Sequence, residues 1–493
     1  MKDLQDLKIL IRSHYPIICI ETVEEERAEN VVARVAEELY LPLFTWSATH
    51  GLKRTGEKQP AYQTRNPIDA LNFIEASSLD GIYLFKDLHH NLTDPLITRK
   101  LRDLCEGFRT RERSMILTAP SFTFPPELSR EIARYDLALP GREELKKLVR
   151  EVIRKITAQE KITVHIEGKD GSTLINNLTG LTLTEAERVL YRVILRDGKL
   201  DAEDLPALLS AKKEKVEQSG VLEFYPKEPS LSDVGGMKNL KHWLAIRKGA
   251  FGEKATQFGL TPPKGILLLG VQGCGKSLMA KAVAREWQLP LLKLDAARLY
   301  NKYIGETEKN LQKAIRLAES MAPTVLWIDE IEKALSGSGT SDGDGGVSTR
   351  ILGTLLSWLQ EKTASVFVVA TSNDITKLPP ELLRKGRLDE IFFVDLPNTE
   401  EREAILRVHL EKKARDPADF DLPALVEASK GFSGAEIEQA IISALYAAFS
   451  GRGVLTTQEI LKEIKSTYPL SVVMKEKIEA LREWAQGRTV PAN

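Results

Sequence analysis

Cysteine is scarce in this sequence. Cys19, Cys105 and Cys274 are the three cysteines among 493 residues, and no two of them form a Cys-x-x-Cys pair. So few and such widely separated cysteines exclude a disulfide framework. The sequence therefore suits a reducing compartment.

Long hydrophobic runs are also missing. The longest apolar stretches, such as residues 266–270, have the length of a β-strand and are too short to cross a bilayer. Residues 1–16 are charged and have no long apolar core, unlike a secretory signal. These features predict a cytoplasmic protein without membrane insertion.

Neither sign of charge is in excess. Lys plus Arg total 69 and Asp plus Glu total 70, so the net charge is −1. This balance gives no global sign of a nucleic-acid or membrane partner. A local basic cluster lies at 99–113, and a solvated helix face is its simpler interpretation. The seven histidines form no HExxH motif or Cys/His cluster, which excludes the usual zinc sites.

The pattern of the chain is that of an α/β protein. Hydrophobic residues make up 42% and charged residues 28%, which excludes a mostly disordered chain. Short apolar runs alternate with helical patterns and predict α/β units around mainly parallel sheets. The pattern weakens between about 199 and 230, where the chain becomes charged and then carries prolines. The stretch reads as a helix followed by a linker, and we place the boundary between two domains there, with the linker over 201–229.

The strongest chemical signal is a phosphate-binding loop. Residues 270–277 read Gly-Val-Gln-Gly-Cys-Gly-Lys-Ser, and they fit the pattern G-x-x-x-x-G-K-[ST] between a predicted strand and a predicted helix. Glycines let the backbone wrap around phosphate oxygens, and the helix N-terminus adds partial positive charge. We predict that Lys276 contacts the β- and γ-phosphates and that Ser277 ligates Mg²⁺.

Two further strand ends provide the expected metal and water chemistry. The apolar strand 325–328 ends in Asp329 and Glu330. We predict that Asp329 holds Mg²⁺ and that Glu330 orients or deprotonates the attacking water. The next apolar strand leads to Asn373, whose amide can bridge this water and the γ-phosphate. An acidic strand end can also cap a helix, but the phosphate loop earlier in the chain favours the catalytic interpretation.

These motifs and their neighbours resemble the AAA family of ATPases over residues 230–450. Residues 233–236 (Asp-Val-Gly-Gly) look like the family's adenine contact, and residues 431–436 look like the nucleotide contact of its helical lid. The resemblance implies ATP as the nucleotide, a P-loop-type parallel sheet over 230–397, and a helical lid with a C-terminal helix over 398–493. The nucleotide-binding residues that it implies are Asp233, Val234, Gly235, Gly270, Val271, Gln272, Gly273, Cys274, Gly275, Lys276, Ser277, Leu278, Gly434 and Ala435.

Residues 382–389 resemble the segment that carries the arginine fingers of this family. Arg384 and Arg387 would then reach the γ-phosphate of a neighbouring subunit, which implies a ring, usually a homo-hexamer. Lys385 stands where proline is usual, and the phosphate loop reads GVQGCGKS rather than the commoner GPPGTGKT. Cys274 in that loop can be a space-filling residue or, if it is exposed, an oxidisable thiol.

Residues 301–306 lie where AAA proteins carry a central pore loop. The resemblance implies that Tyr303, Ile304 and Gly305 face the pore of a ring and grip a passing chain. An aromatic side chain can also stack on the bases of single-stranded nucleic acid, and Tyr303 can instead be a core aromatic. The glycine-rich stretch 336–346 can be a second pore loop or an inert one.

The N-terminal part of the chain looks like a degenerate copy of the same unit. Three pairs of segments repeat in the same order at nearly constant offset: 34–44 with 282–292, 124–130 with 378–384, and 178–190 with 429–441. We therefore predict an AAA-like α/β domain over 1–200 that lacks a phosphate loop. It should not hydrolyse ATP, because Ala28 stands opposite Lys276 and Lys86 stands opposite Asp329.

The whole arrangement resembles the AAA proteins encoded in algal plastid genomes and in cyanobacteria. This resemblance implies a role in photosynthetic physiology, in the bacterial cytoplasm or the plastid stroma. The sequence predicts a Mg²⁺-dependent ATPase that forms a ring and remodels or threads a macromolecule, either a polypeptide or single-stranded nucleic acid. Two alternatives remain open: an ATPase that depends on single-stranded nucleic acid, and a nucleotide-switched scaffold that threads nothing.

Overall fold

The computed structural model of the chain describes most of its residues. These are residues 2–57, 59–77, 79–109, 111–160, 162–165, 168–218, 220–225, 229–252, 255, 257–299, 306–335, 345–451 and 453–493. The expected pore-loop residues Tyr303, Ile304 and Gly305 lie outside the described residues, and so does most of the glycine-rich stretch 336–346.

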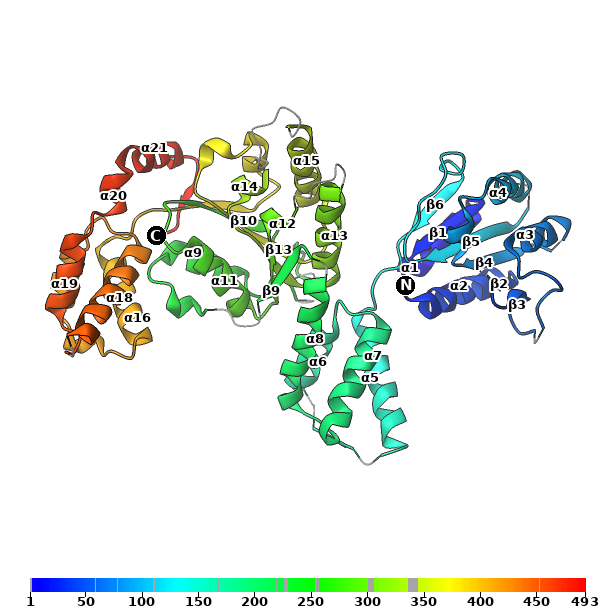
Figure 1. Ribbon diagram of the computed structural model, residues 1–493, viewed down its shortest axis with the longest axis horizontal. Coiled ribbons are helices and arrows are strands. Elements are labelled where there is room, and N and C mark those ends of the chain that lie inside the picture. Colours follow the sequence, from blue (N-terminus) through cyan, green and yellow to red (C-terminus); the bar gives the residue numbers. More distant parts are fainter. Residues whose placement is uncertain are drawn as a thin grey trace. The chain divides into compact units, whose positions relative to one another are not determined.

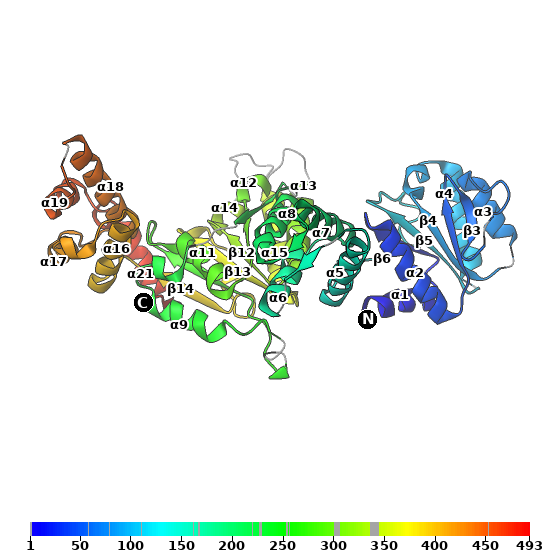
Figure 2. The same ribbon diagram turned by 90° about the horizontal axis from the view of Figure 1, so that it is seen from below.

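The chain divides into two compact units. The first contains residues 1–155 and 181–191, and the second contains residues 156–180 and 192–493. Each unit has its own sheet with helices on both faces (Figure 1, Figure 2). The sheets are mainly parallel, which confirms the predicted α/β class.

The sheet of the first unit has six strands in the order β3-β2-β4-β5-β1-β6. The edge pair of β2 and β3 is antiparallel and the other pairs are parallel. Apolar residues on both faces bury the sheet, as its nearly continuous hydrophobic strands require. The strands are β1 (Ile17–Glu21), β2 (Leu43–Ser47), β3 (Gly51–Arg54), β4 (Gly81–Lys86), β5 (Arg113–Ala119) and β6 (Ile132–Tyr135). The helices are α1 (Lys2–Arg12) and α2 (Glu25–Leu39) on one face, and α3 (Pro67–Ala76) and α4 (Pro95–Phe108) on the other.

The sheet of the second unit has seven strands in the order β15-β14-β10-β13-β12-β11-β9. It is parallel apart from the edge strand β9, which pairs with β11 in the antiparallel sense. The strands are β9 (Leu222–Tyr225), β10 (Gly265–Gly270), β11 (Leu291–Leu294), β12 (Thr324–Ile328), β13 (Val366–Ser372), β14 (Glu390–Val394) and β15 (Val490–Pro491). The helices of this core are α9 (Lys238–Arg247), α11 (Lys276–Trp287), α12 (Ala296–Leu299), α13 (Glu306–Ser320), α14 (Ile331–Leu335) and α15 (Gly345–Glu361).

The two sheets share one strand order. Five parallel strands follow each other as β2-β4-β5-β1-β6 in the first unit and as β11-β12-β13-β10-β14 in the second, where β15 adds a sixth at the edge. Counted along the chain within each unit, both sheets therefore read second, third, fourth, first, fifth. This topology supports the inference, drawn from internal similarity alone, that the N-terminal part is a copy of the same unit.

A helical lid follows the second sheet. Its four helices enclose a small core of their own, which contains Leu406, Leu425 and Ile437. The lid helices are α16 (Thr399–Lys412), α17 (Leu422–Ala428), α18 (Gly434–Ser450) and α19 (Thr457–Ser466), and α20 (Leu470–Val473) and α21 (Lys475–Ala485) come next. Helix α21 buries Ile478 and Leu481, so the C-terminal helix that the resemblance implied packs against the rest of the second unit. β15 then adds an edge strand beside β14.

The stretch 201–229 contains the helix that the sequence led us to expect, but most of its described residues belong to a helix and a strand rather than to a linker. The chain between the two sheets forms helices α5 (Arg142–Thr157), α6 (Gly168–Leu178), α7 (Leu183–Asp197) and α8 (Leu205–Gln218), with the short strands β7 (Thr163–Val164) and β8 (Lys199–Leu200). Helix α8 and strand β9 both fall within the range predicted as linker. In β9, Leu222 and Phe224 are buried and Glu223 and Tyr225 are half-buried. This alternation covers only four residues, which is too short to be recognised as a strand in the sequence.

Within the described residues, no helix combines the length and the apolar character that a membrane crossing requires.

Candidate functional site

The loop between β10 and α11 has the backbone that its glycines predict. Gly273 and Gly275 have φ values of 78° and 84°, in the left-handed region where glycine is favoured. A side chain at Gly273 would also place its Cβ 2.9 Å from the Oγ of Ser433. Helix α11 begins directly after the loop, at Lys276, so its free N–H groups face the same space.

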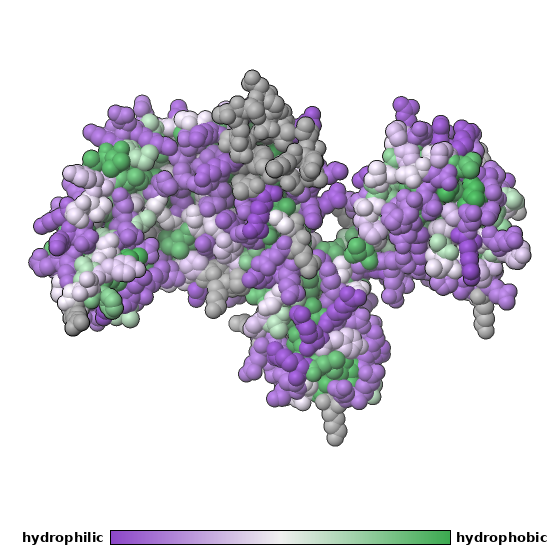
Figure 3. Space-filling view, in the orientation of Figure 1, coloured by the Kyte–Doolittle hydropathy of each residue, from purple (hydrophilic) through white to green (hydrophobic). Residues whose placement is uncertain are grey.

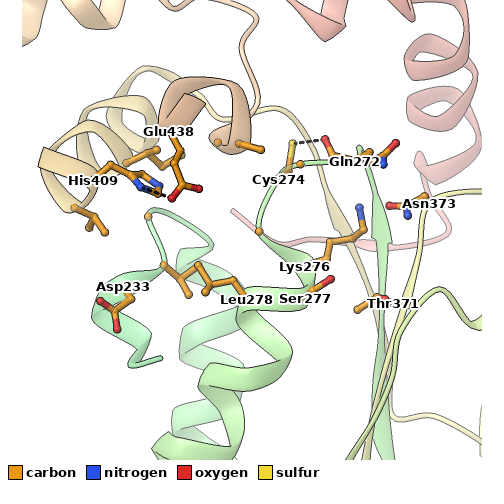
Figure 4. A pocket seen from close by; sticks show the side chains of 18 of the residues that line it. Asp233, Gln272, Cys274, Lys276, Ser277, Leu278, Thr371, Asn373, His409 and Glu438 are labelled. Carbon is orange, nitrogen blue, oxygen red and sulfur yellow. Dashed lines mark hydrogen bonds and ion pairs between the residues drawn. The ribbon is translucent and has the colours of Figure 1, made fainter. Parts of the chain in front are cut away.

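Lys276 points into this loop and is buried (Figure 4). Its Nζ donates to the carbonyl oxygens of Gly270 and Val271, at 2.9 and 2.7 Å. Burial lowers the pKa of Lys276 to about 8, against the opposing charges of nearby carboxylates. These two carbonyls hold the ammonium group in place, and neither Gly270 nor Val271 lines the pocket itself.

Three side chains meet where the resemblance implies a metal. The Oγ of Ser277 donates to Oδ1 of Asp329 at 3.0 Å, and the Oγ1 of Thr371 donates to the same oxygen at 2.6 Å. Ser277 lies in the first turn of α11, Asp329 follows β12 and Thr371 belongs to β13. Hydroxyl and carboxylate oxygens are the donors that Mg²⁺ prefers, so this set fits the ion. Thr371 was not among the predicted site residues, because a buried threonine in an apolar strand gives no separate signal.

Glu330 and Asn373 lie together, as predicted. Asn373 Nδ2 donates to Oε1 of Glu330 at 3.2 Å, and the Asn373 backbone N–H donates to Glu332 at 3.0 Å. Glu330 has a left-handed backbone with φ of 49°, which is strained for a residue with a side chain. Its N–H donates to the Oγ1 of Thr371 at 3.0 Å, so the neighbouring strand end holds this conformation.

The lid closes the other side of the pocket. Asp233, Val234 and Gly235 line it, as do Leu278, Gly434 and Ala435, and the pocket has a volume of about 390 Å³. The lid adds four residues that the sequence analysis missed: Ile405, Val408, His409 and Glu438. These residues belong to helices α16 and α18 and form no recognisable motif in the sequence, so no local signal marked them.

Close packing joins the lid to the core. A Cβ at Gly235 would lie 2.5 Å from Cγ1 of Ile405, so only glycine fits there. The Ala435 N–H donates to the carbonyl of Gly273 at 3.0 Å. His409 Nδ1 lies 3.5 Å from Oε1 of Glu438 (Figure 4), and burial lowers the pKa of this histidine.

A buried carboxylate ties the Asp-Val-Gly-Gly motif to the lid. Glu401 is 5% exposed, and its Oε1 accepts from the Met237 N–H at 3.1 Å. Its Oε2 accepts from Nδ2 of Asn493 at 2.8 Å, and Oδ1 of Asn493 accepts from the same Met237 N–H at 2.7 Å. This junction could not be predicted from the sequence, because its three residues are far apart in the chain.

Cys274 behaves as a space-filling residue. Its side chain is buried, and burial raises the pKa of its thiol to about 12. A buried thiol with a raised pKa is a poor nucleophile. The structure therefore favours packing over the redox interpretation of this residue.

The two predicted arginine fingers lie away from the pocket of their own chain. Arg384 is exposed, and Arg387 donates to the backbone carbonyl of Glu381. Neither lines the nucleotide pocket. Their role toward a neighbouring subunit stays a prediction.

The equivalent place in the first unit is occupied by ion pairs. Lys86 Nζ lies 2.7 Å from Oε2 of Glu29 and 2.9 Å from Oε1 of Glu25. Arg27 is buried, and it lies 3.3 Å from Oε2 of Glu24. In the described residues of the first unit, these paired side chains stand where the second unit has its phosphate loop. No loop of that kind is present among them.

Comparisons with known proteins agree with this geometry. Residues 266–396 match the family model described as ATPase family associated with various cellular activities (AAA). Residues 3–137 and 143–219 match the N-terminal and second domains described for SpoVK-like AAA ATPases. Three similar proteins, each named uncharacterized AAA domain-containing protein ycf46, span almost the whole chain. That of Guillardia theta is 40% identical and covers 99% of this chain and 96% of its own; that of Pyropia yezoensis is 40% identical over 98% of each. That of Trieres chinensis is 38% identical and covers 99% and 97%.

Proposed function

This chain belongs to the AAA family of ATPases, and we propose that its second unit binds ATP with Mg²⁺ and hydrolyses the ATP to ADP and phosphate. One observation carries the proposal. A buried lysine, a Ser–Asp pair and a Glu–Asn pair converge from three strand ends on one pocket beneath the lid. This set contains the phosphate, metal and water contacts that phosphoryl transfer needs.

Each side chain has a role that its position allows. Lys276 places a positive charge against the phosphates, and the loop N–H groups bind their oxygens. Ser277 and Asp329 would hold Mg²⁺, which when bound neutralises charge on the phosphate oxygens. Glu330 accepts a proton from the attacking water, and Asn373 positions that carboxylate through its 3.2 Å hydrogen bond.

Replacement of Glu330 by glutamine tests the hydrolytic step. Glu330→Gln keeps the shape of the side chain and removes its basicity, so ATP binding should persist while turnover falls by about 10²- to 10⁴-fold. Binding of a fluorescent ATP analogue and release of phosphate measure the two effects. Undiminished turnover would remove Glu330 from the role assigned to it.

We further propose that the protein works as a homo-oligomeric ring, usually a hexamer in this family. Arg384 and Arg387 lie away from their own pocket, which supports a role at the pocket of a neighbour. Arg387→Ala should lose hydrolysis, and an excess of Glu330→Gln subunits should restore part of it by supplying intact arginines. Mixed assemblies without any recovery would argue against a finger that acts between subunits.

We propose a polypeptide as the macromolecule on which the ring acts. The basic cluster in and after α4 offers little free charge to nucleic acid, because Arg99 pairs with Asp103 at 2.7 Å and Arg109 with Glu131 at 2.7 Å. ATPase rates with unfolded protein, RNA or DNA decide between the candidates, and a steep salt dependence would indicate nucleic acid.

The Tyr303→Ala variant separates a motor from a scaffold. Tyr303→Ala should stop a threading motor and leave a nucleotide-switched scaffold intact. We propose that this work takes place in the bacterial cytoplasm or the plastid stroma and supports photosynthetic physiology, as the family resemblance implies.

A further inference from the structure

A second pocket lies at the opposite edge of the second sheet. Its volume is about 490 Å³, within the range of small-molecule sites. Helices α6 and α8 form one wall, beside β9 (Figure 1). The other wall is the last turn of α11 with the residues that precede β11 and β12. Parallel strands begin at this edge and end at the nucleotide pocket, so the two sites are separate.

The charged side chains that line this pocket all have the same sign among the described residues. Among the described residues that line it, two are cationic and several carry amides or hydroxyls, and none is Asp or Glu. The polar lining residues are Thr173, Asn176, Asn177, Thr179, Lys212, Tyr225, Arg285 and Gln288. A buried lysine among hydrogen-bond donors, in a pocket whose described lining residues include no Asp or Glu, favours a negatively charged occupant.

Lys212 on α8 is the decisive residue. Its side chain is 2% exposed, and its Nζ donates to the backbone carbonyl of Asn176 at 3.2 Å. In the described part of the chain no carboxylate forms an ion pair with it, and burial lowers its pKa to about 8, so it is largely protonated at neutral pH. A buried ammonium without a paired charge is a cost to stability. A methionine of similar length would avoid that cost.

We propose that this pocket binds a small anion with carboxylate or phosphate groups, and that Lys212 is its charge partner. The anion would lie between α6, α8 and the end of α11, with Arg285 and Gln288 contributing from that end. Helix α11 starts at Lys276 in the phosphate loop and ends at Trp287 beside this pocket. The bound anion would therefore connect helices α6 and α8 to the C-terminal end of α11, the helix whose N-terminal end lies at the nucleotide site.

The test uses the full chain with its phosphate loop disabled. Lys276→Ala removes the main cation of the nucleotide site, so that anions bound elsewhere can be measured. Inorganic phosphate, pyrophosphate, succinate and citrate are added separately, and Tm and isothermal titration report binding. At least one of these anions should raise Tm by about 5 °C when its concentration is a hundredfold above its Kd. The identity of that anion distinguishes a phosphate ligand from a carboxylate ligand.

Variants in the same background locate the site. Lys212→Met should weaken the anion at least tenfold, and Lys212→Arg should keep part of the response. Lys213→Met is the matched control, because Lys213 is its neighbour on α8 and does not line the pocket. Gln288→Glu places a carboxylate at the exposed mouth of the pocket and should also abolish the anion-dependent rise in Tm. This variant tests the proposal even if the Lys212→Met protein does not fold.

Two results would overturn the proposal. One is the absence of any anion-dependent shift in the Lys276→Ala chain. The other is an unchanged shift after Lys212→Met or Gln288→Glu, which would mean that Lys212 only caps the C-terminal carbonyls of α6. Neither result depends on ATP hydrolysis, so the outcome is independent of the proposed ATPase activity.

Discussion

The two α/β units have the same backbone in places where their chemistry differs. Tyr40 after α2 and Gln288 after α11 are 248 residues apart, and both have a left-handed φ of 56°. Asp87 after β4 and Glu330 after β12 are also both left-handed, with φ of 55° and 49°. Equivalent helices and strands therefore end in backbone turns of the same conformation. The difference in chemistry lies in the side chains and in one loop.

Side chains of opposite charge replace the metal pair. In the second unit the Oγ of Ser277 lies 3.0 Å from Oδ1 of Asp329. At the same two places in the first unit, Glu29 pairs with Lys86 at 2.7 Å. Where the second unit has a carboxylate that could bind a cation, the first unit has the ammonium group of a lysine. The positive charge of this ammonium group occupies the position that the cation would have. This internal pair satisfies the site without any ligand.

The loop itself also differs. Helix α2 begins at Glu25, which corresponds to Gly273, so the first unit has helix where the second has glycine loop. Left-handed glycines hold the second loop open, whereas residues with side chains continue the helix. The first unit therefore has the same strand order without a glycine loop: a helix stands at that position, and the charged side chains beside it are paired with one another.

The largest expected effect comes from Lys276→Ala. Removing a buried, hydrogen-bonded cation that contacts phosphate should weaken ATP binding by at least about a hundredfold. Lys86→Ala, at the corresponding site of the first unit, should change ATP affinity less than about twofold. Titration with a fluorescent ATP analogue measures both. An equal loss in the two variants would show that the units do not differ in nucleotide binding.

Arg27→Met should destabilise the first unit by about 3–5 kcal/mol, because it leaves the buried carboxylate of Glu24 without its partner. Hydrogen exchange of α2 and β1 in the full chain reports this change. The double variant Glu24→Gln/Arg27→Met should recover most of the protection. If exchange stays the same in Arg27→Met, the ion pair does not hold the closed loop.

Gly273→Ala should weaken ATP binding about tenfold. Alanine is strained by about 1–2 kcal/mol at a φ of 78°, and its Cβ would press on Ser433. Gly107→Ala in α4 is the matched control, since a Cβ there meets nothing within 4 Å and should leave ATP affinity unchanged. Wild-type affinity in Gly273→Ala would mean that the open loop does not depend on its glycine.

Asn493→Ala should have the smallest effect, a loss of ATP affinity of about three- to tenfold. It removes two hydrogen bonds at the Glu401 junction, each worth about 1 kcal/mol, while the Met237 N–H keeps its bond to Glu401. Lys475→Ala on the exposed face of α21 serves as control and should bind ATP normally. An unaltered KM for ATP in Asn493→Ala would separate this junction from the nucleotide site.

Much of the site could be predicted from the sequence because its parts are local. The phosphate loop is a continuous segment, and Asp329, Glu330 and Asn373 each end an apolar strand. Parallel strands bring their carboxyl ends to one edge, so separate strand ends could be assigned to one site. The loss of the site in the first unit was also visible, since Ala28 and Lys86 stand at key positions.

Other features depend on contacts between distant segments. Ile405, His409 and Glu438 come to the pocket only because the lid helices pack against the loop and the Asp-Val-Gly-Gly motif. β9 was mistaken for linker, because a four-residue edge strand is stabilised by its partner β11 rather than by its own pattern.

The sequence by itself determined the α/β class, the phosphate loop, the acidic strand ends and the degeneracy of the first unit. These follow from periodicity, from the conformational freedom of glycine and from the sign of charges at aligned positions. Only the tertiary structure decided that Glu29 pairs with Lys86, that Glu401 joins the lid to Met237, and that Lys212 is buried beside a pocket without carboxylates. Each of these depends on which side chains meet across the fold, and burial then fixes the energetic consequence of the meeting.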